Sequence, residues 1–158
     1  MADNQQTKTL IPTQWIADNF GMLESASVTL CIVSYLLRVF DVEGWGLAVG
    51  ISFSFYAAFV YLAAFIPHTT NSLVASVATR VCGISGSVTL IGLLFTFLHF
   101  PGAKSMLQIG SVTLGIAGII LLVLFATSKE KAHLRSIIRS LLLALFGIAH
   151  LIYQPGLV

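Results

Sequence analysis

The sequence predicts an all-α polytopic membrane protein, a helical bundle of four or five transmembrane helices. Two observations support this prediction: 57% of the residues are hydrophobic and only 9% are charged, whereas roughly 25% of an average soluble domain is charged. Eight basic and six acidic side chains are too few to build a water-facing surface around 158 residues, so lipid is expected to solvate most of it.

Two parts are expected along the chain. Residues 1–20 are predicted to be a polar tail and an amphipathic helix in the headgroup region, with Trp15 as its anchor. An irregular lead-in to the first span is the alternative. Residues 21–158 are predicted to form a single transmembrane helical domain. The polar start of the chain lacks the short apolar core of a signal peptide, so the first span is expected to direct insertion.

Windows of about 20 apolar residues define the predicted spans. These windows fall at about 21–40, 44–66, 79–99, 104–127 and 136–153. The last window is the shortest and either crosses the membrane or lies partly in the interface, which leaves the count at four or five.

Basic residues gather on one predicted side of the membrane. That side holds Lys8, Arg80, Lys129, Lys131 and Arg135. The opposite side has Arg38 and Lys104, offset by Asp41 and Glu43. Because loops rich in Lys and Arg stay in the cytoplasm, we expect a cytoplasmic N-terminus.

A duplicated helical hairpin is predicted from a short repeat. The string Ser-Ala-Ser-Val-Thr-Leu at 25–30 is matched by Ser-Gly-Ser-Val-Thr-Leu at 85–90, a period of 60 residues. Each string is followed by an apolar run and a turn that contains glycine, so the first two pairs of spans are expected to correspond.

Small residues recur at three- or four-residue spacing in two predicted spans. The sets are Gly46, Gly50 and Ser54, and Ser111, Gly115 and Gly118. This spacing places them on one helix face, where they let a second helix backbone approach closely. The faces are expected to pack either inside the bundle or against another copy of the chain.

A polar patch is predicted on the outer side. It consists of Arg38, Asp41, Glu43, His99 and Lys104. Arg38 and Asp41 are three residues apart and would form an interfacial ion pair if their helix continued. The functional alternative is a patch for partner docking or ion access.

No catalytic, metal or cofactor site is predicted. His99 and His150 are the best candidates for axial haem ligands, but His99 ends a helix beside Pro101, so no cofactor is expected. Residues 44–79, 81–103 and 105–128 contain no Asp, Glu, Lys or Arg. Ion-coupled transporters usually need an ionisable group at mid-membrane, so these charge-free spans disfavour such transport and leave binding of a hydrophobic substrate open.

One segment resembles a known family. Its matching residues are Gly92, Phe95, His99, Phe100, Gly102, Met106, Leu107, Ile109, Gly110 and Thr113. Residues 92–125 resemble the membrane hairpin of the L subunit of the gliding-motility and type IX secretion motor of Bacteroidetes. Thr96 replaces the family's Lys, and Leu114 replaces its membrane Glu, so the motor role does not carry over. The resemblance implies a related hairpin used for packing or docking, in a bacterial inner membrane.

The sequence favours a non-enzymatic protein, a structural or accessory subunit of a larger membrane complex. The alternative is a small transporter, channel or carrier of a lipophilic ligand, and a second alternative is a haem-binding redox subunit. Expected partners are the lipid bilayer and other membrane subunits or a second copy. The few scattered basic residues exclude nucleic acid.

Overall fold

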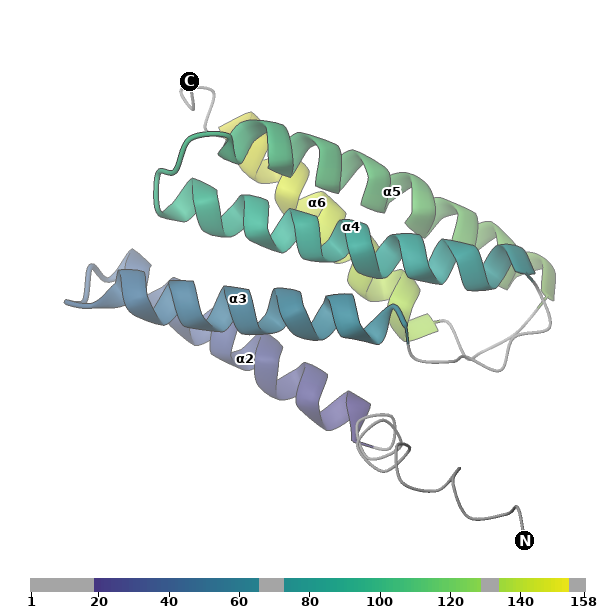
Figure 1. Ribbon diagram of the computed structural model, residues 1–158, viewed down its shortest axis with the longest axis horizontal. Coiled ribbons are helices and arrows are strands. Elements are labelled where there is room, and N and C mark those ends of the chain that lie inside the picture. The colour runs from purple at the N-terminus through teal and green to yellow at the C-terminus, as the bar shows by residue number, and fades with distance from the viewer. Residues whose placement is uncertain (1–18, 66–72, 129–133, 154–158) are drawn as a thin grey trace, which may run out of the picture.

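The computed structural model describes residues 19–65, 73–128 and 134–153. These residues form helices that pack as a bundle (Figure 1). Each helix is long and apolar enough to cross a membrane, so the predicted helical membrane bundle is confirmed and has a fifth candidate span. Most of the expected interfacial helix lies outside the described residues. The helices are α2 (Phe20–Val39), α3 (Trp45–Ala63), α4 (Leu73–Phe97), α5 (Ala103–Ser128) and α6 (Leu134–Tyr153).

Helix α4 is the centre of the bundle. It packs against α3, α5 and α6, and α6 also packs along α5. Helix α2 packs on α3, and within the described residues it makes no direct backbone approach to α6. In α2 and α6, 17% and 22% of the span is buried, against 67% in α4. The two helices line opposite sides of a groove whose floor is formed by residues of α3 and α4.

The turns α2–α3 and α4–α5 have the same backbone geometry. Asp41 and Gly44 have φ angles of 50° and 85°, and His99 and Gly102 have φ angles of 57° and 83°. The left-handed region favours glycine, which explains the glycine three residues after the start of each turn. The structure thus places corresponding positions 58 residues apart, from 41 to 99 and from 44 to 102.

Equivalent hydrogen bonds end α2 and α4. The amide of Val42 donates to the carbonyl of Leu37 at 3.0 Å, and the amide of Phe100 donates to the carbonyl of Phe95 at 2.8 Å. Both bonds are the six-residue closure of a Schellman motif. The repeated strings are 60 residues apart, so they are offset by two residues from the 58-residue spacing of the two turns. Because two residues turn a helix by about 200°, the matching strings face nearly opposite directions.

The two hairpins differ in how closely their helices approach. At Gly92, an added Cβ would lie 2.8 Å from the backbone nitrogen of Leu107, so α4 and α5 touch backbone to backbone. The position that corresponds to Gly92 is Ser34, which accepts a hydrogen bond from the Ser52 hydroxyl at 2.7 Å. A serine pair links α2 to α3, whereas glycine lets the backbones of α4 and α5 approach closely.

Candidate functional site

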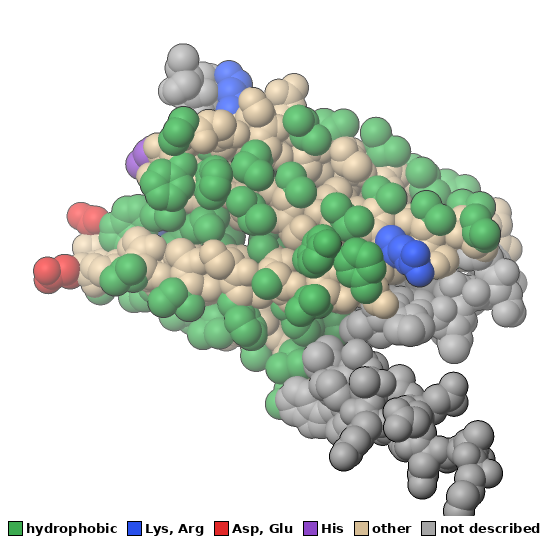
Figure 2. Space-filling model, in the orientation of Figure 1, with side chains coloured by type: hydrophobic (Ala, Val, Ile, Leu, Met, Phe, Trp, Pro, Cys, Tyr) green, Lys and Arg blue, Asp and Glu red, His purple; other side chains and the backbone are tan. Residues whose placement is uncertain are grey.

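A groove runs between α2 and α6, with α3 and α4 as its floor. Its volume is about 1150 Å³. Hydrophobic side chains are spread over the face of the bundle that Figure 2 shows, and hydrophobic side chains also form most of the groove walls. The apolar lining includes Val28 and Ile32 of α2, Leu142 and Phe146 of α6, and Phe53 and Leu90 of the floor. The groove exists because the backbones of α2 and α6 stay apart, although the Tyr35 and Phe146 rings meet between them at a centroid distance of 6.3 Å.

An ion pair joins α2 and α6 at one end of the groove. The Nη1 atom of Arg139 lies 2.9 Å from Oε1 of Glu24, and the two side chains are 12% and 15% exposed. Glu24 is the fifth residue of α2 and Arg139 the sixth of α6, so each sits about 6–8 Å inside its helix end. It is the one ion pair in the part of the chain that the structure describes.

Arg139 has hydrogen-bonding capacity left over. Its guanidinium carries five N–H donors, and its single hydrogen bond within the described residues goes to Glu24. The hydroxyls of Ser25 and Thr29, which line the same groove, donate to their own helix, to the carbonyls of Gly21 and Ser25 at 2.8 Å. The groove is therefore largely apolar, with Tyr35 and Tyr56 also in its lining and one charged pair at its end.

Arg38 lies at the opposite end of the bundle and turns inward. Its guanidinium carbon lies 4.5 Å from the ring centre of Phe97 and 5.4 Å from that of Trp45, which are cation–π distances. No ion pair between Arg38 and Asp41 forms, because α2 ends at Val39 and Asp41 turns into the left-handed region. The predicted ion pair between Arg38 and Asp41 is therefore wrong, because the helix does not continue to Asp41.

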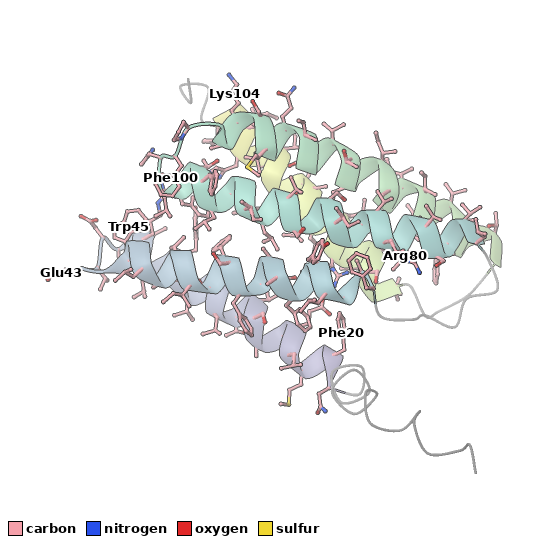
Figure 3. All side chains as sticks on the ribbon, viewed as in Figure 1. Phe20, Glu43, Trp45, Arg80, Phe100 and Lys104 are labelled. Atoms are coloured by element: carbon pink, nitrogen blue, oxygen red, sulfur yellow. The ribbon has the colours of Figure 1, made fainter. Side chains whose placement is uncertain are left out.

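The other members of the predicted outer patch are exposed on two turns. Asp41 and Glu43 lie on the α2–α3 turn, and His99 and Lys104 lie at the α4–α5 turn. Figure 3 shows Glu43 and Lys104 at the same end of the bundle, away from Phe20 and Arg80. These four side chains share one end of the molecule, but none of them lines the groove.

The two candidate haem ligands are in different surroundings. His99 is exposed in the turn after α4, whereas the His150 ring packs between Phe97 and Phe146 at centroid distances of 5.1 and 5.9 Å. Neither imidazole lines the groove. Among the described residues, no three His, Cys, Asp or Glu side chains gather in a way that would hold a metal ion.

The small-residue face of α5 packs inside the bundle. A Cβ added at Gly118 would lie 2.9 Å from the hydroxyl oxygen of Ser140, and one at Gly115 would lie 3.9 Å from Cβ of Ala144. Ser111 is fully buried beside α6. This face therefore sets the close contact between α5 and α6.

The small-residue face of α3 points largely outward. A Cβ added at Gly46 would lie 3.7 Å from Leu98, but one at Gly50 would meet nothing within 4 Å. Ser54 is exposed. From Gly50 onward, this face has no neighbour in the described part of the chain.

Sequence reasoning missed the pairing of Glu24 with Arg139. Each residue looked like a charge near a helix end that reaches for the interface, because nothing local links positions 115 residues apart. The usable signal was that each lies inside an apolar span. A charge inside a span needs a partner of opposite sign, and only a few such charges exist in this chain.

Residues 92–125, which resemble the motor subunit, form the C-terminal end of α4, the turn and most of α5. Comparison of the whole chain with known protein families, with curated proteins and with solved structures finds no match.

Proposed function

We propose that this membrane protein binds a lipid-like amphiphile in the groove between α2 and α6. The observation that supports the proposal is a cavity of about 1150 Å³ with largely apolar walls. Small-molecule sites commonly measure about 300–1,000 Å³ and combine apolar walls with a few polar groups. The groove is slightly larger than this range and has a single charged pair at its end.

The groove opens toward the lipid rather than toward water. Ile32 on α2 and Leu142 on α6 line it and are 55% and 61% exposed. A ligand with hydrocarbon chains can therefore enter sideways between the two helices and keep its chains in an apolar environment throughout. This geometry favours a carrier or binder of a lipophilic ligand over a channel.

Thr29→Trp tests the proposal because it places a bulky ring inside the groove. The matched control is Thr127→Trp, since Thr127 is also exposed and also donates its hydroxyl to a carbonyl of its own helix, but lies outside the groove. The wild type and the control are expected to retain lipid through detergent exchange, measured by native mass spectrometry. Thr29→Trp is expected to lose it. Equal retention by the two variants would overturn the proposal.

The proposal includes a location. We place the chain in a bacterial inner membrane with its N-terminus in the cytoplasm. Lys8, Lys129 and Lys131 then lie on the cytoplasmic side, as does the groove end with Glu24 and Arg139.

An accessory role in a larger membrane assembly is the second candidate. The outward small-residue face of α3 favours it, because Gly50 has nothing within 4 Å and Ser54 is exposed. Ser54→Cys is expected to cross-link to a second copy or to a co-purifying subunit in native membranes, in a variant that lacks Cys31 and Cys82. Val112→Cys, which is exposed on α5, is the control, and equal cross-linking at both positions would contradict this role.

A further inference from the structure

We propose that Glu24 and Arg139 together form a headgroup site for a zwitterionic lipid with a phosphate and a primary ammonium. The inference rests on the proposed function, since the lipid chains occupy the groove. The phosphate binds Arg139, the ammonium binds Glu24, and the ion pair opens between them.

The position of the pair supports a headgroup site. Both residues line the groove and sit at one end of it, where the polar part of an amphiphile would lie near the membrane interface while its chains extend along Val28, Ile32 and Leu142. Within the described residues, the pair is also the only direct link between α2 and α6 that any hydrogen bond or ion pair provides. A headgroup that inserts here therefore breaks no other polar contact between the two helices, which also touch through the rings of Tyr35 and Phe146 at a centroid distance of 6.3 Å.

The chemistry of the pair selects the charge of the ligand. Arg139 has N–H groups without a hydrogen-bond partner in the described chain, and a guanidinium binds phosphate with two parallel hydrogen bonds. If an anionic lipid took Arg139 alone, Glu24 would be left without a partner in an apolar environment, which is costly. A zwitterion leaves both charges compensated.

The two ends of the headgroup need different partners. A carboxylate accepts hydrogen bonds only, so Glu24 is suited to a primary ammonium with N–H donors and less suited to a quaternary ammonium that has none. The proposed order of preference is a phosphoethanolamine headgroup first, with phosphocholine and phosphoglycerol headgroups behind it.

The test is competition between three lipids with identical chains. Wild-type protein in mixed micelles is offered phosphatidylethanolamine, phosphatidylcholine and phosphatidylglycerol, and native mass spectrometry counts the bound species. About a tenfold preference for phosphatidylethanolamine is expected, since a charge-assisted hydrogen bond is lost in each alternative. Inorganic phosphate with ethanolamine, without chains, is expected not to compete.

Variants assign the preference to the two residues. Glu24→Gln is expected to shift binding toward phosphatidylglycerol because Arg139 keeps its charge. The double variant E24Q/R139Q removes both charges, so it leaves no buried ion unpaired, and it is expected to bind all three lipids equally. Monodisperse elution confirms that each variant is folded.

The outcomes separate the two proposals. If the wild type binds the three lipids equally and Thr29→Trp loses them all, the groove holds lipid and the headgroup inference is wrong. If the double variant keeps the wild-type preference, the inference is also wrong. If Thr29→Trp retains lipid as the control does, the groove itself is not the binding site.

Discussion

At the scale of single residues, the Glu24–Arg139 pair determines the character of the groove. The two side chains are mostly enclosed, and the surrounding lining is apolar. In such a place the attraction between opposite charges is strong, but so is the cost of removing each charge from water. Removing one partner is therefore far worse than removing both.

Glu24→Leu is expected to destabilise the protein by about 3 kcal/mol, because Arg139 is left buried without its partner. Replacing both residues by leucine is expected to restore most of the loss. Thermal unfolding in detergent measures both effects. A double variant less stable than the single variant would contradict this account of the pair.

At the scale of helices, glycine placement separates a tight hairpin from a loose one. Gly92 brings α4 and α5 into backbone contact, whereas the corresponding Ser34 is bridged by a hydroxyl hydrogen bond to Ser52. The loose hairpin leaves α2 displaced from the rest of the bundle. The groove is a consequence of this difference.

Gly92→Ala is expected to destabilise the protein by about 1–3 kcal/mol, because the new methyl group would lie 2.8 Å from a backbone atom of α5 that cannot move aside. Gly50→Ala is the matched control in α3, where the methyl group meets nothing within 4 Å. It is expected to be neutral or to stabilise by up to about 1 kcal/mol. Similar melting temperatures for the two variants would refute the difference in packing.

The fold class and the spans were predictable from the sequence, because lipid requires long apolar helices with internally satisfied backbones. The groove was not predictable. It depends on which helices fail to meet, and this follows from tertiary contacts at residues such as Gly92 and Ser52. The 60-residue string repeat also pointed to the wrong register, because short apolar strings carry little information on which face packs. The pairing of Glu24 with Arg139 required the fold.

At the scale of the whole molecule, the two ends of the bundle differ. One end exposes Asp41, Glu43, His99 and Lys104 on its turns, and the other contains the Glu24–Arg139 pair and Arg80. Because the charged pair lies near one end of the bundle, the polar end of the groove is nearer to that end than to the acidic turn at Asp41 and Glu43.

The orientation predicts which positions an impermeant reagent reaches. In a variant without Cys31 and Cys82, Glu43→Cys is expected to react with an impermeant maleimide in intact cells. Arg80→Cys, which is also exposed, is expected to react only after the cells are opened. The reverse pattern would place the N-terminus outside the cytoplasm.

The distance along the chain between Glu24 and Arg139 has a consequence for biosynthesis. Glu24 belongs to the first described span and Arg139 to the last, 115 residues later. During synthesis from the N-terminus, α2 enters the membrane while its carboxylate still lacks its partner. A ribosome must add α3, α4 and α5 before α6 brings the guanidinium that neutralises it. Of the described helices, α2 is inserted first, yet its carboxylate gains its partner only after α6 has been made.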